Sequence, residues 1–205
     1  MVKNNKIDTI PLDGGLLCLD FVNTVPNRKE EPQRYYFSDI QDLITWGRRL
    51  KVIDAKTEKQ LKAEAERQPK KAASFFGEAI AFRELLYVLF WHISAGKKIP
   101  MAELGRYNDM LKIYFPSLQI KQLQEGFKEE WILEEINFKR LLAPVLNDSY
   151  ETLLSDKLIR IKECSSCGWL FYDTTKNGKR RWCSMKSCGS NVKALEWYHR
   201  QKKNL

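Results

Sequence analysis

Apolar residues recur at helical spacing through most of the first 115 residues of the chain. In the segment 38–53 they fall three to four residues apart, and Ser38 lies three residues before Gln41, the spacing of a capping box that opens a helix. The next segment, 54–68, has few large apolar residues and predicts an exposed helix that ends before Pro69.

The segment 70–98 has the broadest apolar stripe in the chain. Its spacing predicts a long helix, which Gly96 and then Pro100 would stop. A further short helix is expected over 101–115. The stripe of the long helix consists of Phe76, Ile80, Phe82, Leu86, Leu89, Phe90 and Ile93.

The pattern changes to alternation after residue 116. Apolar and polar residues alternate on either side of Glu125–Gly126, which predicts a two-stranded hairpin turning there. Helical spacing returns over 136–163, with Pro144 as an expected kink or break. The first 158 residues therefore predict a mainly α domain, a helical body with a β-hairpin.

Composition and apolar run lengths favour a globular protein. The 205 residues are 43% hydrophobic and 12% aromatic, enough for a packed core. The first residues lack the apolar run of a signal peptide, and the run at 85–95 is too short to span a bilayer. We therefore expect a cytoplasmic protein with no membrane partner.

Positive charge gathers in the last quarter of the chain. The net charge is +9, and residues 160–205 hold eleven lysines and arginines against three acidic residues. This asymmetry predicts a nearly neutral body with a basic, polyanion-binding segment at its C-terminal end. A solvated basic tail is the alternative.

Four of the five cysteines fall in the same basic segment. Cys164 and Cys167 are spaced C-x2-C, and Cys183 and Cys188 are spaced C-x4-C fifteen residues later. Two close pairs at this separation are typical of a tetrahedral, structural Zn²⁺ site, because four thiolates fill every coordination position. A disulfide framework or a redox dithiol fits less well, since no secretory signal and no βαβ pattern are present.

The sequence around the cysteines predicts a treble-clef-like module over 159–205. Gly168 suits a turn beside the metal, 169–173 reads as a strand, and Asn177–Gly178 as the turn to a returning strand at 179–183. A helix is expected from about Ser190. No flexible linker precedes Cys164, so we expect the module to be packed against the body.

Two stretches resemble a known family. The residues "GWLFYDTTKNGKRRWCSMKSCGSNVKA" resemble the CGNR-type zinc finger of bacterial proteins, and "GGLLCLDFVNTV" resembles the start of the ABATE domain that precedes it. The resemblance runs from about Leu12 to Lys203 and implies a stress-induced transcriptional regulator. It also implies that the four cysteines are the zinc ligands. The residues that match the zinc-finger signature around the cysteines are Asp173, Arg180, Arg181, Trp182 and Met185.

One position departs from the family pattern. Where the family reads Cys-Gly-Asn-Arg, this chain has Ser190 and Asn191 after Cys188 and Gly189, so the arginine is missing. Nucleic-acid contacts are nevertheless expected from basic and polar residues of the module. The predicted contact residues are Lys179, Arg180, Arg181, Lys186, Asn191, Lys193 and Arg200.

Side-chain directions in the module are also predicted. On the final helix, Lys193, Trp197, Arg200 and Asn204 would share a face. We favour Trp197 packing against the hairpin, with Val192 and Leu195 also turned inward. Arg180 and Arg181 would alternate on the returning strand, one facing outward and the other paired, with Asp173 as the candidate partner.

The N-terminal body offers a weaker candidate for small-molecule binding. Asp20, Asn23 and Arg28 could line an effector pocket, although capping or buried hydrogen bonding is the favoured interpretation of Asp20 and Asn23. His92 and Cys18 are interpreted as core residues. Because no catalytic motif is present, we do not expect an enzyme.

Three functions are compatible with these features. The first is a DNA-binding transcriptional regulator in which the zinc module contacts DNA and the body senses a ligand or forms a homodimer. The second is an RNA- or protein-interaction module, because basic charge does not distinguish these partners. The third is a small-molecule receptor without DNA binding.

Overall fold

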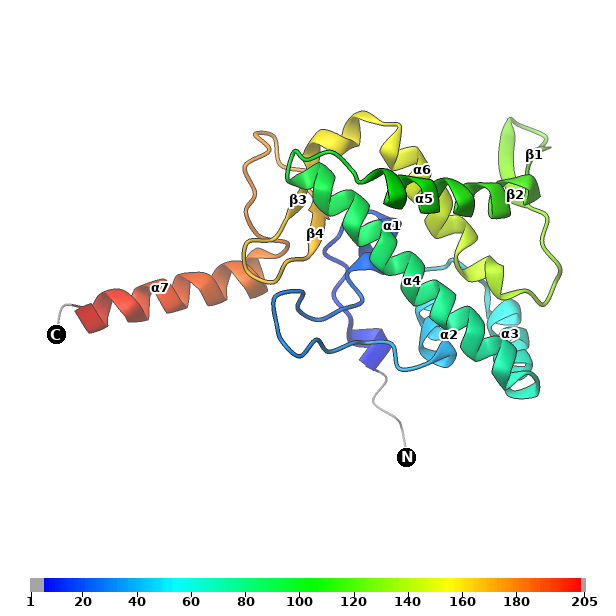
Figure 1. Ribbon diagram of the computed structural model, residues 1–205, viewed down its shortest axis with the longest axis horizontal. Coiled ribbons are helices and arrows are strands. Elements are labelled where there is room, and N and C mark those ends of the chain that lie inside the picture. Colours follow the sequence, from blue (N-terminus) through cyan, green and yellow to red (C-terminus); the bar gives the residue numbers. More distant parts are fainter. Residues whose placement is uncertain (1–5, 204–205) are drawn as a thin grey trace.

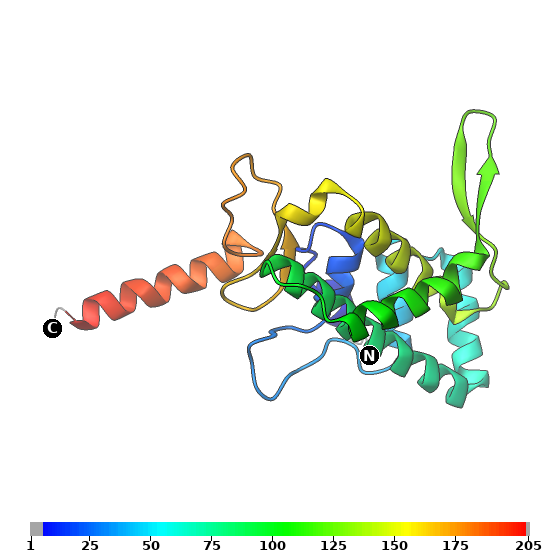
Figure 2. The ribbon, with the colours of Figure 1, turned by 45° about the horizontal axis from the view of Figure 1, so that its top comes forward.

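The computed structural model describes residues 6–203 and has the expected mainly helical architecture with two small antiparallel sheets (Figures 1 and 2). Its α-helices are α1 (Leu17–Val22), α2 (Ile40–Arg49), α3 (Ala55–Arg67), α4 (Pro69–Ser94), α5 (Met101–Tyr114), α6 (Ala143–Leu153) and α7 (Ser190–Lys203). Short 3-10 helices span Lys6–Thr9, Phe115–Ser117, Phe138–Leu141 and Asp156–Arg160, and a π-helical turn spans Met185–Gly189.

Each sheet is a pair of strands. The first joins β1 (Leu118–Gln122) to β2 (Phe127–Trp131), with Leu118 opposite Trp131, and confirms the hairpin that turns at Gly126. The second joins β3 (Ile161–Glu163) to β4 (Leu170–Tyr172), with Lys162 opposite Phe171. This second pair lies where the body meets the cysteine module.

The long helix α4 forms the centre of the body, as its broad apolar stripe predicts. It contacts α1, α2, α3, α5 and the two strands β3 and β4. Phe82, Leu86 and Leu89 are buried along it, and Phe21 of α1 lies between Phe82 and Trp46 of α2, with ring centroids 6.2 and 5.4 Å away. This aromatic packing fixes α1, which in turn positions the residues that contact the cysteine module.

Three helix boundaries differ from the sequence prediction. Asp39, rather than Ser38, caps α2 by accepting hydrogen bonds from the amides of Gln41 and Asp42. Pro69 begins α4, and Pro144 lies in the first turn of α6 rather than kinking a longer helix. Proline is favoured in a first turn because its missing N–H has no helical partner there.

Two elements project from opposite ends of the body. The β1–β2 hairpin extends from one end, and α7 extends from the cysteine module at the other (Figures 1 and 2). Within residues 6–203, none of the helices combines the length and apolarity that crossing a membrane requires.

Candidate metal centre and nucleic-acid interface

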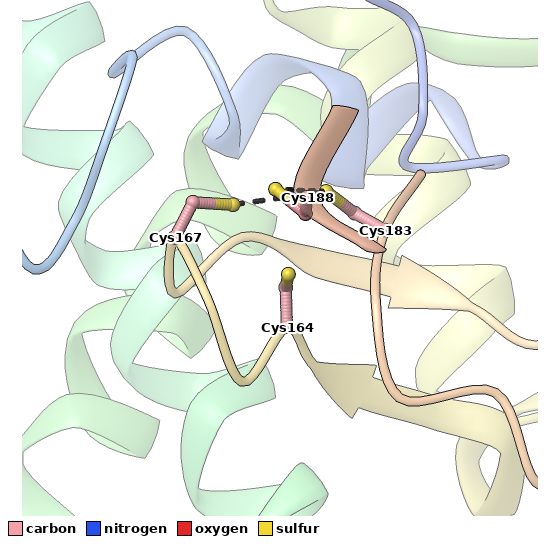
Figure 3. A group of neighbouring side chains, drawn as sticks. All are labelled: Cys164, Cys167, Cys183 and Cys188. Carbon is pink, nitrogen blue, oxygen red and sulfur yellow. Dashed lines mark hydrogen bonds between the residues drawn. The ribbon is translucent and has the colours of Figure 1, made fainter. Parts of the chain in front are cut away.

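The four cysteines converge on one place from different local structures (Figure 3). Cys164 follows β3, Cys167 lies in the turn before β4, and Cys188 lies in the π-helical turn before α7. Cys183 comes from the irregular segment between them. All four sulfur atoms lie within 4.8 Å of one another.

The sulfur geometry fits a tetrahedral metal ion. The Cys167 and Cys183 sulfurs are 3.6 Å apart, and those of Cys183 and Cys188 are 3.7 Å apart. Ligands at about 2.3 Å from a tetrahedral Zn²⁺ would be separated by about 3.8 Å. The thiols are close enough to share protons: hydrogen bonds from Cys167 and Cys183 lower the pKa of Cys164, and the same contacts raise the pKa values of Cys167 and Cys183.

The turn at Gly168 holds the first cysteine pair. Gly168 has φ of +75°, and its amide donates to the Cys164 carbonyl oxygen at 3.0 Å. A Cβ at this position would lie 2.8 Å from Cβ of Arg28. Glycine is required here both by the left-handed backbone and by the close approach of the body.

The strand partner within the module was wrongly predicted. β4 pairs with β3, which precedes Cys164, and not with residues 179–183, which are not a strand. Residues 174–183 form a loop in place of the predicted returning strand. The predicted Asn177–Gly178 turn remains within this loop, where Gly178 has φ of +56°.

Asp173 organises the loop between the cysteine pairs. Its buried carboxylate accepts hydrogen bonds from the amide and hydroxyl of Thr175, the amide of Arg180 and Nζ of Lys162 at 2.6–3.0 Å. Burial raises its pKa, but the hydrogen bonds from Thr175 and Lys162 outweigh burial and lower the pKa below its usual value. The charged partner of Asp173 is therefore Lys162, whereas Arg180 contributes only its backbone amide.

Arg180 and Arg181 have different environments. The Arg180 guanidinium donates to the carbonyl oxygens of Trp182 and Cys183 and lies 4.8 Å from the Phe171 ring centroid, so it braces the metal site. Arg181 is exposed and lies over the Trp182 ring. As predicted, one arginine faces inward and one outward, although they are not on a strand.

The remaining predicted nucleic-acid contacts are exposed. Lys179, Lys186, Asn191, Lys193 and Arg200 all have exposed side chains. Among residues 6–203, no ion pair involves any of these four cations or Arg181. Their positive charge is therefore available to an external partner.

The prediction that α7 packs onto the module is wrong. Trp197, Tyr198 and Leu195 are 60, 55 and 58% exposed, and Val192 is half-buried. α7 leaves the module after its first turn, so its aromatic residues have no hairpin to cover (Figure 1). Lys193, Trp197 and Arg200 keep the spacing of a shared face, while Asn204 lies outside the described residues.

The three residues predicted to line an effector pocket make contacts that join or support the two parts of the chain. Asn23 is fully buried; its Nδ2 donates to the Leu170 carbonyl oxygen at 2.8 Å, and the Leu170 amide donates to its Oδ1 at 3.1 Å. The side-chain amide thus pairs with β4 as a neighbouring strand would. This confirms the favoured interpretation of Asn23, buried hydrogen bonding.

Arg28 lies at the same junction. Its amide donates to the Cys167 carbonyl oxygen at 2.8 Å, and its buried guanidinium binds Glu84 and the Val22 carbonyl oxygen and lies over the Tyr87 ring. Arg28 therefore connects the metal-binding turn to α1 and α4. These contacts leave its guanidinium facing protein groups.

Asp20 serves the turn before α1. Its Oδ1 accepts from the Gly14 amide at 2.9 Å, and only 8% of the residue is exposed. Burial raises its pKa to about 6, and the nearby Asp13 and Asp148 also raise it. The position confirms buried hydrogen bonding in a turn as its interpretation.

Residues that the sequence analysis did not single out complete the junction. Trp169 is buried, and its Nε1 donates to the Val25 carbonyl oxygen at 2.6 Å. Trp169 and Phe171 pack with the cysteines, whereas Leu170 belongs to the helical core. The sequence predicts a strand here, and the continuous apolar run of "WLFYD" is the signal that both of its faces would be buried.

A helical body joined by buried hydrogen bonds to a four-cysteine cluster is the architecture of a zinc-finger protein with a helical domain. Comparison with known families identifies the two parts. Residues 15–156 match the ABATE family, described as "Putative stress-induced transcription regulator", and residues 160–201 match the CGNR zinc finger. The chain belongs to the ABATE family, with a CGNR zinc finger after it. The curated proteins contain no match to it.

Proposed function

We propose that the protein is a cytoplasmic DNA-binding transcription regulator, with Zn²⁺ held by Cys164, Cys167, Cys183 and Cys188 as a structural ion. The observation that carries the proposal is the unpaired, exposed cation set built directly on the metal module. The family description of a transcription regulator supports it. In this proposal the protein has no catalytic role.

Two parts of the module would meet the DNA. The loop 174–183 and the π-helical turn present Lys179, Arg181 and Lys186, and α7 presents Lys193 and Arg200. Backbone phosphates are recognised by lysine and arginine, and a projecting helix can enter a major groove. Rigid attachment through Asn23, Trp169 and Arg28 would orient both parts relative to the body.

Salt dependence of duplex binding tests this proposal. Fluorescence anisotropy of a labelled duplex should show binding that weakens with salt, with a log–log slope of about 0.9 for each neutralised phosphate. The triple variant Lys193→Gln, Arg200→Gln, Lys202→Gln should lower the slope by about 2 to 3. A matched control is Lys59→Gln, Lys70→Gln, Lys71→Gln, which removes the same charge from exposed positions of the body.

Two results would contradict DNA binding by this module. One is no interaction with duplex at low salt by the zinc-loaded protein. The other is an equal fall in slope for the control variant, which would show that only total charge matters.

RNA or protein binding is the second candidate, and the exposed aromatic residues of α7 favour it. Trp197 and Tyr198 are free to stack on unpaired bases or to enter a protein interface. Competition between single-stranded RNA and duplex DNA for the same protein separates these functions. A homodimer and a small-molecule effector stay predictions, which light scattering and ligand-induced shifts in melting temperature would test.

A further inference from the structure

A hollow of about 950 Å³ lies beside the metal centre, between the loop that begins at Thr175 and the turn around Met185. Asp13, from the segment before α1, contributes to its wall. Cavities that take small organic ligands have volumes of about 300–1,000 Å³. The hollow is therefore of the size that holds a small molecule or one unit of a polymer.

Five basic residues line the hollow, and all but the half-buried Arg180 are exposed. The four exposed residues are Lys176, Lys179, Arg181 and Lys186, and among residues 6–203 none of them forms an ion pair. Asp13 is the one acidic residue in the lining. The uncompensated charge favours a ligand with more than one negative charge, such as a phosphate chain.

The same lining has an apolar part. Trp182 and Met185 both contribute to it and pack over Gly189, where a Cβ would lie 3.2 Å from Cε3 of Trp182 and 2.5 Å from Sδ of Met185. Arg180 holds the backbone beneath them by donating to the Trp182 and Cys183 carbonyl oxygens. The aromatic ring and the thioether are thus presented by a braced segment beside the metal ligands.

We propose that this hollow binds a nucleotide, with the base against Trp182 and Met185 and the phosphates on the four exposed cations. An aromatic surface next to cations matches a planar base that carries phosphates, and base–aromatic stacking tolerates any base. Bases inside a duplex are stacked and cannot reach such a surface. The proposal goes beyond duplex binding and does not depend on it.

Two sources could supply this chemistry, a free nucleotide or an unpaired nucleotide of a nucleic-acid strand. Isothermal titration of the zinc-loaded, full-length protein with ATP, with tripolyphosphate and with a single-stranded DNA pentamer distinguishes them. We expect ATP to bind about tenfold more tightly than tripolyphosphate, because only ATP has a base to stack. If the pentamer alone shows base-dependent binding, the source is a strand.

Variants test whether the binding occurs in the hollow. Trp182→Leu should weaken binding of the base-containing ligand by about tenfold while tripolyphosphate changes little. Lys179→Gln should weaken it by about two- to fivefold. The control Lys59→Gln removes an exposed cation of the body, outside the lining, and should leave binding unchanged. Zinc content, measured on every variant, checks that the module is folded.

If Trp182→Leu loses zinc, its module is not folded and its binding does not test the proposal. The proposal is then tested by the comparison of ATP with tripolyphosphate and by the Lys179→Gln variant. Three results would overturn the proposal. They are base-dependent binding by neither ATP nor the pentamer, no binding by either ATP or the pentamer, and equal weakening by Lys179→Gln and Lys59→Gln. Each can occur while duplex binding persists, so failure here is separate from failure of the DNA-binding proposal.

Discussion

The side chain of Asp20, which lies in the stretch that resembles the start of the ABATE domain, stabilises a turn of the fold. Its carboxylate accepts the Gly14 amide in the turn before α1, near Asp13, Asp148 and Arg49. A carboxylate at such a site is costly because burial favours the neutral form. The sequence alone could not reveal that Asp20 is buried near a second carboxylate, because Asp148 lies far from it along the chain.

Asp20→Asn should therefore stabilise the protein at neutral pH. The folded pKa of about 6 exceeds the value of 3.8 for a free side chain, so protonated Asp20 stabilises the fold fully below about pH 4, and this contribution is lost as the pH rises through 6. Asparagine stays neutral and can still accept the Gly14 amide. The variant should gain on the order of 3 kcal/mol over the wild type above pH 7, and less at pH 5.

Denaturant unfolding of both proteins between pH 5 and 8 measures this difference. The gap should widen up to about pH 7 and then level off, following the titration of Asp20. A variant less stable than the wild type at pH 8 would contradict the assignment of Asp20 as a buried, destabilising carboxylate.

At the scale of elements, β4 is the wall shared by the helical core and the metal module. Leu170 packs into the core of the body, while Trp169 and Phe171 pack with the cysteines. Asn23 occupies the place of a strand beside β4 through its two hydrogen bonds to Leu170. Loss of that side chain would leave buried backbone groups without partners.

Asn23→Ala should destabilise the protein by about 2–5 kcal/mol, because the Leu170 N–H and C=O would both lose their partner in a buried site. The control is Asn147→Ala, which removes an amide that bonds Glu129 and Glu151 at the surface and should cost less than about 1 kcal/mol. Thermal unfolding of the two variants gives the comparison. Equal losses would mean that the Asn23 contact has no special role.

The elements themselves were predicted better than their contacts. Helical periodicity located α2 to α6 and the hairpin because those patterns are local. It failed for the partner of β4 and for the packing of α7, since strand pairing and burial depend on distant residues. The cysteine spacing was enough to predict the cluster, whereas the junction formed by Asn23 and Arg28 was visible only in three dimensions.

At the scale of the whole molecule, the body and the metal module share one continuous set of contacts. Arg28 bonds the Cys167 carbonyl oxygen, Trp169 bonds the Val25 carbonyl oxygen, and the Tyr172 amide donates to the Gly14 carbonyl oxygen at 2.8 Å. Because the fold of the module depends on metal, loss of the metal should also destabilise the body.

Removing the metal should lower the melting temperature of the whole chain in one transition. The unfolded module would expose the Leu170 side of the helical core, and loss of a tightly bound ion removes its stabilisation by mass action. Calorimetry with and without a chelator, under reducing conditions, measures the shift. Two separate transitions, with that of the body unchanged, would contradict this coupling.

Elemental analysis supplies the matched control. The wild type and Cys18→Ala should each hold one zinc per chain, because Cys18 lies in α1 away from the cluster, whereas Cys164→Ser should bind it more weakly. Because three thiolates and a water can still hold zinc, the decisive result is affinity: zinc bound by Cys164→Ser as tightly as by the wild type in competition with a chelator would exclude Cys164 as a ligand.

The isolation of α7 affects the thermodynamics of any complex it enters. A helix of 14 residues without tertiary packing has little intrinsic stability in water. Part of the free energy of association must then go to keeping it helical, so the measured affinity will be lower than the contact area alone suggests. Substituting alanine at exposed Gln201 would raise helix propensity and, with no new contact, tighten binding.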